Sequence, residues 1–253
     1  MISFVTAVKL VLGYEDFVFR LKVYIECIAE GCAVPYEIII VEERDHKNVA
    51  LVCDFLTDPW LAERKARVVG YNAYYPNPHG YNMIEAYAKN AGIKAARYDF
   101  VCVTNCDLFF NAAFFSLLPG LKPSTFYRFL QFETRGLPSQ WSWEKVKILQ
   151  SQENLLNPCL INKSTRTINA VAYKSGDIML MHRDIWNKIK GFPENEEWVH
   201  SDLVVCTVVC NNNIPVEVPS EAFVYTYPQI RTVGDHRRAM VKAQTYLKKK
   251  ECN

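Results

Sequence analysis

The sequence predicts an α/β fold built on a largely parallel sheet, and three observations support this prediction. Residues 2–8 form a short apolar run, which is typical of a buried strand. Apolar residues then recur at i, i+4, i+7, i+8 and i+11 from Phe17 to Ile28, the spacing of a helix, and Gly31 is placed to end it. Residues 37–41 are continuous and mostly β-branched, which is typical of a strand covered on both faces.

The middle of the chain continues the alternation. Residues 82–85 resemble a helix N-terminal cap, and we expect a helix from there to Gly92. Residues 98–104 form the next predicted strand. This β-α-β-α-β order is typical of nucleotide-binding sheets, in which ligands bind beyond the carboxyl ends of the strands. The sequence contains neither GxGxxG nor a Walker glycine-rich loop, which argues against dehydrogenases and NTPases.

The second half of the chain is less regular. It predicts strands at 126–132 and 178–181, helices at 184–190 and 202–210, and a basic helical tail after residue 239. The polar, tryptophan-containing stretch 136–168 is predicted to be an insertion of helix and loop over a site. Because no linker and no repeat interrupts the chain, we expect residues 1–253 to form a single domain.

Composition excludes several classes of protein. The chain has 253 residues and a formal charge of +2, a near-balance that gives no electrostatic argument for nucleic-acid binding and leaves room only for local basic spots. Nine cysteines without a CxxC pair give little support for a zinc site, and they predict reduced, buried thiols. No apolar stretch approaches the roughly 20 residues of a membrane span, and the N-terminus lacks a basic secretory lead. We therefore expect a cytoplasmic protein with no transmembrane segment.

A carboxylate stands where the third predicted strand ends. Asn105, Cys106 and Asp107 follow that strand directly. A hard oxygen ligand at this position can hold Mg²⁺ or Mn²⁺ against a diphosphate. The alternative is that Asp107 starts a turn or caps a helix near Asn111.

Several segments, in this order, resemble the GT-A glycosyltransferases that use nucleotide-sugar donors, in particular the family-2-like enzymes. The resemblance covers about residues 1–230, and it includes an N-x-D form of the DxD motif. Its segments are the strand that ends in Glu42, Asn90 to Lys94, Thr104 to Asp107, Ser175 to Trp186, Gly191 to Glu194 and Trp198 to Asp202.

The resemblance implies a single GT-A domain, with a Rossmann-like mixed sheet and helices on both faces. Residues 1–110 would bind the nucleotide sugar, residues 111–235 would bind the acceptor, and residues 236–253 would form the basic tail. The implied reaction moves a hexose or deoxyhexose from a nucleotide-diphosphate sugar to a hydroxyl of a carbohydrate or glycoconjugate. The implied stereochemistry is inverting, with Mn²⁺ or Mg²⁺ as the cofactor.

The resemblance also implies donor-binding residues. Glu42 would bind the base or ribose, although it could be an ordinary carboxylate in a charged loop. Asp107 would hold the metal, and Asn105 would contact the ribose or a metal-bound water. The other implied donor residues are Asn90, Lys94 and Arg97 for the phosphates, or a solvated helix face instead, and Ser175, Gly176 and Asp177 for the sugar, or a simple turn.

For the acceptor, the resemblance implies Asp202 as the base that takes a proton from the attacking hydroxyl, with Glu197 as the second candidate. Asp202 could instead only cap its helix. Trp198 would offer its ring face to a sugar, and His200 would orient the carboxylate or pack internally. His236 is the candidate late metal ligand; with Arg237 and Arg238 it forms a basic cluster that would close over the diphosphate or be a surface turn.

The sequence departs from the family at three places: Asn105 replaces an aspartate, the acceptor loop has His-Ser-Asp in place of Glu-Asp, and no histidine directly follows the last strand. A non-catalytic domain that binds a nucleotide or glycan is therefore one alternative. A sugar-nucleotide pyrophosphorylase is another, but residues 9–16 contain one glycine where that class has a glycine-rich basic loop. A retaining transferase is a third.

Overall fold

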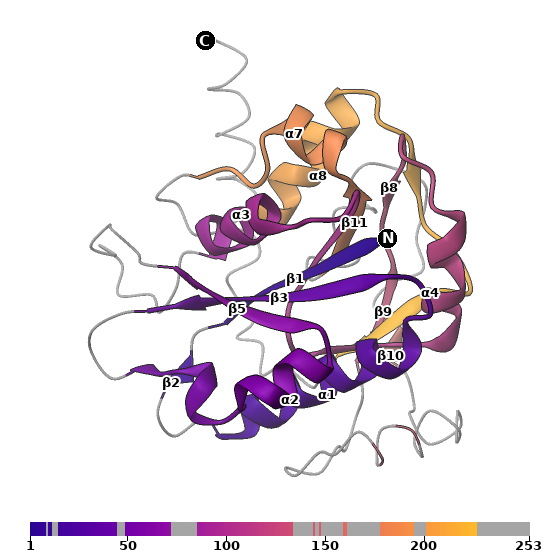
Figure 1. The fold of residues 1–253 in the computed structure, drawn as a ribbon. Coiled ribbons are helices and arrows are strands. Elements are labelled where there is room, and N and C mark those ends of the chain that lie inside the picture. The colour runs from indigo at the N-terminus through magenta and orange to yellow at the C-terminus, as the bar shows by residue number, and fades with distance from the viewer. Residues whose placement is uncertain are drawn as a thin grey trace.

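The computed structural model describes residues 1–8, 10–11, 15–44, 49–71, 85–133, 144, 147, 159–160, 178–194 and 201–226. A seven-stranded sheet in the order β12-β8-β11-β6-β1-β3-β5 forms the centre of this part of the chain (Figure 1). Its strands are β1 (Ile2–Val8), β3 (Tyr36–Glu43), β5 (Ala66–Tyr71), β6 (Phe100–Thr104), β8 (Phe126–Tyr127), β11 (Ile178–His182) and β12 (Val216–Glu217).

The central sheet is mixed, as predicted. β1 pairs in parallel with β3 and β6, and β3 pairs in parallel with β5. β11 is antiparallel to β6 and to β8, and β12 is parallel to β8. β11 is antiparallel to the other six strands of this sheet. The carboxyl ends of those six strands therefore lie at the same edge. We call it the carboxyl edge; Glu42, Thr104 and Ile178 lie there, and Ile178 pairs with Thr104.

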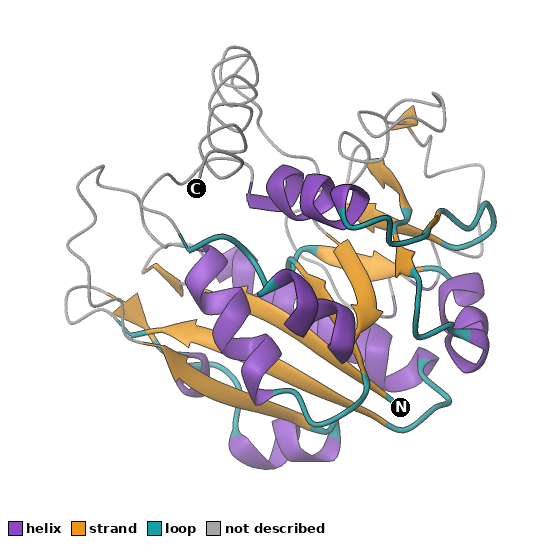
Figure 2. Cartoon of the chain, turned by 90° about the horizontal axis from the view of Figure 1, so that it is seen from above, coloured by secondary structure: helices purple, strands orange, loops and turns teal. Residues whose placement is uncertain are grey.

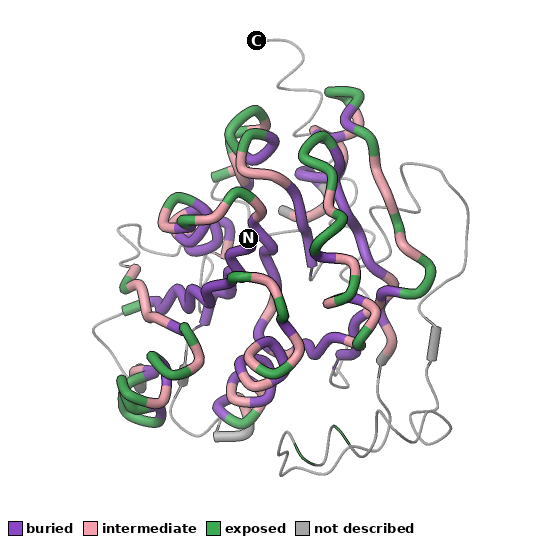
Figure 3. Tube along the Cα trace, turned by 45° about the vertical axis from the view of Figure 1, so that its right-hand side comes forward, coloured by how far each residue is buried: buried purple, intermediate pink, exposed green. Residues whose placement is uncertain are grey.

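Helices cover both faces of the sheet (Figures 1 and 2). α1 (Glu15–Gly31) and α2 (Asp58–Glu63) lie on one face, and α3 (Glu85–Ala95), α7 (Arg183–Ile189) and α8 (Ser201–Asn211) lie on the other. Side chains of β1 alternate between the two cores: Phe4 packs with the α1 side and Val5 with the α3 side. Both faces are therefore buried, which explains the continuous apolar runs of β1 and β3 (Figure 3).

Gly92 does not end α3, contrary to the sequence prediction. The helix continues to Ala95. A Cβ atom at Gly92 would lie 2.2 Å from Cγ1 of Val5 and 2.9 Å from Cγ2 of Val41. The glycine therefore lets α3 lie close against β1 and β3, and it is a packing residue rather than a C-cap.

The predicted strand at 126–132 is two strands, which is a second correction. β8 ends at Tyr127 in the central sheet, and the next strand begins at Leu130 in a four-stranded sheet of order β10-β9-β13-β7. The strands of this second sheet are β7 (Leu108–Phe110), β9 (Leu130–Glu133), β10 (Cys159–Leu160) and β13 (Phe223–Thr226). The remaining described elements are β2 (Leu10–Val11), β4 (Val49–Ala50), α4 (Ala112–Leu117) and the 3-10 helices η1 (Val52–Asp54) and η2 (Leu118–Gly120).

The direction of each crossover helix fixes which of its ends reaches the carboxyl edge. α3 leads into β6, and α8 leads into β12. α3 lies between the parallel strands β5 and β6, and a helix between parallel strands runs back across the sheet, so Glu85 lies at the carboxyl-edge end of α3. α8 ends beside the start of β8, where the Pro215 carbonyl accepts a hydrogen bond from the Phe126 amide, so Asp202 lies at the end of α8 that is farther from the start of β8. α7 ends as predicted, with left-handed backbone at Lys190 (φ 64°) and Gly191 (φ 72°).

The predicted division into a donor half, an acceptor half and a tail stays a prediction. Most of the 136–168 insertion and all of the basic tail lie outside the described residues. Among the described helices, none combines the length and the apolar character needed to cross a bilayer.

Candidate functional site

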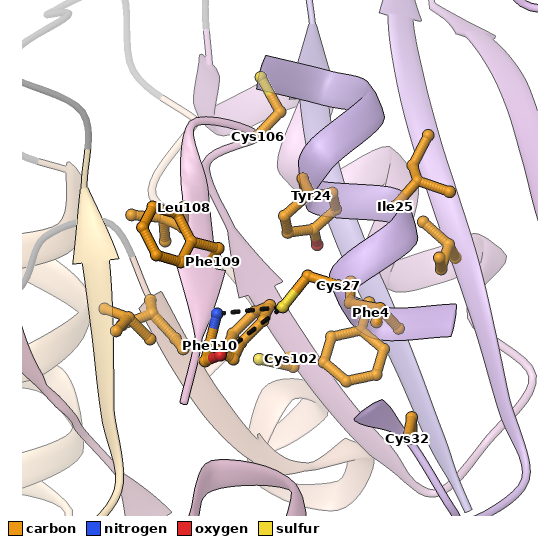
Figure 4. Close-up of a cluster of buried hydrophobic side chains, with 14 of the residues drawn as sticks. Phe4, Tyr24, Ile25, Cys27, Cys32, Cys102, Cys106, Leu108, Phe109 and Phe110 are labelled. Carbon is orange, nitrogen blue, oxygen red and sulfur yellow. Dashed lines mark hydrogen bonds between the residues drawn. The ribbon is translucent and has the colours of Figure 1, made fainter. Parts of the chain in front are cut away.

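Hydrogen bonds with α1 hold the two ends of the segment that carries Asp107. The Thr104 hydroxyl, at the end of β6, donates a hydrogen bond of 2.7 Å to the hydroxyl oxygen of Tyr24. The Cys27 thiol donates to the Phe110 carbonyl (3.6 Å) and accepts from the Phe110 amide (3.3 Å) (Figure 4). Cys106 is itself buried in the same core. The polar turn at residues 105–107 thus lies between two residues, Thr104 and Phe110, that hydrogen bonds connect to α1.

Asp107 does not cap the following helix. The N-cap of α4 is Asn111, whose Oδ1 accepts a hydrogen bond of 3.1 Å from the amide of Phe114. The sequence left two structural roles open for Asp107, a helix cap or the start of a turn. The structure excludes the helix cap and is consistent with the turn. The role of Asp107 as a metal ligand stays a prediction.

Charged groups from three elements surround this turn. Burial raises the pKa of the Cys106 thiol well above its ordinary value, and the neighbouring Asp107 carboxylate raises it further. Arg20 of α1 lowers that pKa and Glu85 of α3 raises it. Asp107, Arg20 and Glu85 therefore all lie within electrostatic reach of one buried thiol.

Lys89 is a site residue that the sequence reasoning missed. It is only 4% exposed, and its Nζ atom lies 2.5 Å from Oε1 of Glu85 and 3.1 Å from Oδ1 of Asn105. The ring centroid of Phe192 lies 5.5 Å from the same Nζ atom. A buried ammonium group thus joins the first turns of α3 to the turn after β6. Its spacing of four residues from Glu85, on the helix before the metal strand, is the sequence feature that could have revealed it.

Asn90 is engaged within the protein. Its Nδ2 atom donates to the Phe192 carbonyl (2.9 Å) and to Oε1 of Glu194 (2.9 Å), and its Oδ1 accepts from the Phe192 amide (2.8 Å). A Cβ atom at Gly191 would lie 2.3 Å from that Oδ1. Asn90 therefore fastens the segment after α7 to α3, close to Lys89. Its predicted contact with the donor phosphates stays a prediction.

Lys94 and Arg97 are not brought to the site. Both are exposed at the far end of α3, and the Arg97 amide donates a 2.6 Å hydrogen bond to Oε1 of Glu37. Glu37 is the second residue of β3, at the edge opposite Asp107. A helix of 11 residues spans about 16 Å, which separates these cations from the carboxyl edge. The sequence interpretation counted their distance along the chain from β6 but not the direction of the helix.

Glu42 is 1% exposed at the end of β3. Its Oε1 accepts from the Val52 amide, and its Oε2 lies 3.3 Å from Nε of Arg44. The same residue lines a pocket of about 450 Å³ together with Arg44, Cys53, Asp58, Leu61, Ala66, Arg67 and Val68. A carboxylate has about four acceptor sites, so these two contacts leave capacity for a ligand in the pocket.

Asp202 lies in the first turn of α8 and is partly buried. It lies at the end of α8 that is farther from the start of β8, and its place in one site with Asp107 stays a prediction. The other predicted site residues lie outside the described residues: Ser175, Gly176, Asp177, Glu197, Trp198, His200 and His236. Ser175 to Asp177 directly precede β11, whose first residue pairs with Thr104.

The oxygen donors at the turn suit a hard divalent cation. Asp107 offers a carboxylate and Asn105 an amide oxygen. In the described part of the chain, no cluster of three His, Cys, Asp or Glu residues is arranged to hold a metal ion. A cation at Asp107 would therefore complete its coordination with diphosphate oxygens, water or residues beyond the described ones.

Comparison with known proteins places the fold. No family model matches the chain, and no curated protein matches it. Among solved structures it is similar to S. aureus TarS 1–349, with a TM-score of 0.56 and 14% identity over 89% of this chain and 60% of that one. It is also similar to TarS 1–349 in complex with UDP-GlcNAc (TM-score 0.57, 13% identity, 91% and 59% covered) and with UDP (0.54, 14%, 90% and 61%).

The chain thus spans about three fifths of the length of these TarS chains. At this level of identity the likeness shows the fold alone. It confirms the predicted GT-A fold, with its mixed sheet and helices on both faces.

Proposed function

We propose that this protein is a glycosyltransferase that moves a sugar from a nucleotide-diphosphate sugar to a carbohydrate hydroxyl. The observation that carries the proposal is the contact between the buried Lys89 ammonium and Asn105, two residues before Asp107. A cation and a hard oxygen ligand side by side, beyond the end of a central strand, are suited to a diphosphate. The TarS structures that share the fold were determined with UDP-GlcNAc and with UDP, which supports a uridine-diphosphate sugar as the donor.

The donor would be bound in three parts. Asp107 would hold Mn²⁺ or Mg²⁺ against the two phosphates, and such an ion, when bound, supplies Lewis-acid stabilisation of the leaving diphosphate. Lys89 would balance the phosphate charge from the side of α3, and Asn105 would orient the ribose or a coordinated water. The pocket beside Glu42 is proposed to take the base or the ribose. Ser175, Gly176 and Asp177 are proposed to lie beside the sugar.

The transfer step would be a single displacement with inversion. The acceptor hydroxyl oxygen forms a bond to the anomeric carbon, and its proton passes to the carboxylate of Asp202. The bond between that carbon and the diphosphate oxygen breaks, and the electron pair leaves with the nucleoside diphosphate. Trp198 and His200 are proposed to contact the acceptor, and Glu197 and His236 are proposed as a second carboxylate and a late metal ligand. A cytoplasmic location stays a prediction.

Release of nucleoside diphosphate from a panel of nucleotide sugars, with Mn²⁺ and a mixture of oligosaccharide acceptors, tests the proposal. We expect the wild-type chain to release diphosphate and the Asp202→Asn variant to bind the same donor without turnover. Donor binding is followed by thermal shift, because ligand at 100 times its dissociation constant stabilises a protein by about 2.7 kcal/mol. A wild-type chain that binds donors but never releases diphosphate would instead identify a non-catalytic binding domain.

A further inference from the structure

Arg128 is a buried arginine that the predicted site does not include. It lies between β8 and β9 and is 1% exposed. Its Nη1 atom donates to the carbonyl of Ile178 (3.1 Å), at the carboxyl edge, and its backbone amide donates to the carbonyl of Glu217 (3.0 Å). Burial of a guanidinium group costs several kcal/mol unless the surroundings compensate its charge. The burial of Arg128 therefore predicts that a negatively charged group lies near its guanidinium group.

The alternation of the strand directs Arg128 toward α8. Phe126 belongs to the core on the α8 side, whereas Tyr127 belongs to the opposite core. Arg128 follows Phe126 by two residues and thus shares its face. The guanidinium carbon lies 5.7 Å from the ring centroid of Phe126, which agrees with this placement.

The direction of α8 then brings its first turns to Arg128. Cys206 and Val209 of α8 pack in the same core as Phe126. The Val209 carbonyl accepts a hydrogen bond from the Ile214 amide, and the Pro215 carbonyl accepts one from the Phe126 amide, so the C-terminal end of α8 lies beside Phe126. Arg128 follows Phe126 along the chain, and Cys206 and Asp202 lie successively farther from that end of α8. Asp202 is one helical turn from Cys206 and lies on the same helix face.

Arg128 and Asp202 both influence the pKa of the Cys206 thiol. Burial raises the pKa of Cys206 to about 11; Arg128 lowers that pKa, and Asp202 and Cys210 raise it. Arg128, directly after β8, and Asp202, in the first turn of α8, therefore both lie within electrostatic reach of one buried thiol.

We propose that Arg128 is a positioning residue that keeps the Asp202 carboxylate ionised and oriented for transfer, a role that rests on the proposed function. A carboxylate beside a buried cation keeps its charge to lower pH than one in water. A base that a third group orients is a recurring arrangement in nucleophilic catalysis. Arg128 thus acts through Asp202 and touches neither donor nor acceptor.

Arg128→Gln and Arg128→Lys separate the charge of Arg128 from its shape, with the pH dependence of kcat/KM as the readout. We expect the acidic limb of the profile to move up by about one pH unit in Arg128→Gln, and to stay in place in Arg128→Lys, because the lysine keeps the positive charge. Arg183→Gln is the matched control. Arg183 also donates to backbone carbonyls, those of Ala96 and Tyr98, but at the opposite edge of the sheet. An acidic limb that stays unchanged in Arg128→Gln would overturn the proposal.

A measurement on the wild-type chain covers the case in which Arg128→Gln does not fold. The carboxyl carbon signal of Asp202, assigned by its loss in Asp202→Asn, should titrate below the ordinary aspartate value of about 3.9. Titration at or above that value would overturn the proposal. Failure of the proposed function has a different outcome, because the wild-type chain would then release no diphosphate and would give no pH profile of kcat/KM.

Discussion

The Nζ atom of Lys89 lies 3.1 Å from the Oδ1 atom of Asn105, so the helix before β6 and the turn after it meet at one buried ammonium group. This contact fixes the geometry of the proposed donor site before any donor arrives. The same ammonium group also pairs with Glu85, and we expect its charge to meet a diphosphate bound at Asp107.

Replacement of Lys89 by methionine should weaken donor binding about tenfold or more, because it removes a charge-assisted phosphate contact. Lys94→Met, on the same helix but at its far end, should leave donor affinity unchanged. Titration calorimetry with a UDP-sugar and Mn²⁺ measures both variants. Equal weakening by the two changes would show that the site was placed at the wrong edge of the sheet.

Replacement of Asp107 by asparagine should reduce turnover by about a hundredfold or more, because a neutral amide oxygen binds a divalent cation more weakly than a charged carboxylate does. Folding should be preserved, since the cap of α4 belongs to Asn111. The complementary change, Asn111→Ala, should lower the free energy of unfolding by about 1 kcal/mol and leave turnover intact. Initial rates and thermal melts of the two variants test this division of roles, which fails if Asp107→Asn keeps most of its activity.

Gly92→Ala should destabilise the fold by about 1–3 kcal/mol, because the added methyl meets Val5 and Val41 and pushes α3 from the sheet. Gly120→Ala is the control, since a Cβ atom there meets nothing within 4 Å. Melting temperatures compare the two, and Gly92→Ala should fall by several degrees. A melting temperature equal to that of the wild type would remove the packing explanation for this glycine.

The stability of the fold should decline at alkaline pH because of its buried thiols. Burial raises the pKa of Cys27 to about 12, so the folded chain keeps this proton while an unfolded thiol loses it near pH 9. The stabilisation is complete below pH 9 and decreases as the pH rises toward 12, by about 1.4 kcal/mol per thiol at pH 10. Cys27→Ala should lower stability at pH 7 and reduce the further loss between pH 8 and 10.

The matched control for this effect is Cys53→Ser, which replaces an exposed cysteine. Denaturant unfolding at several pH values measures both variants against the wild type. The explanation would be wrong if Cys27→Ala and the wild type lost stability in parallel over this range.

Periodicity predicted the framework of this fold well. The apolar runs of β1 and β3 and the stripe of α1 were recognisable because each is buried along its whole length. The break between Tyr127 and Leu130 was not, because β8 and β9 are both apolar and differ only in the sheet that they join. Gly92 was misassigned because a glycine that allows close packing looks the same in sequence as one that ends a helix.

The site residues that directly follow a strand could be predicted from the sequence. Those whose position depends on the direction of a helix across the sheet could not. Asp107 and Asn105 follow β6, so their place could be inferred from the sequence. Lys94 and Arg97 were misplaced because proximity to β6 in sequence corresponds to the wrong edge in space. Lys89 and Arg128 are buried cations, and only the paired strands and helices show which charges they meet.

The most direct test of the donor site is a crystal structure of the chain with UDP and Mn²⁺. The account predicts the cation on Asp107 and a phosphate oxygen within about 3 Å of the Lys89 Nζ atom. A diphosphate bound at the opposite edge, beside Lys94 and Arg97, would contradict it.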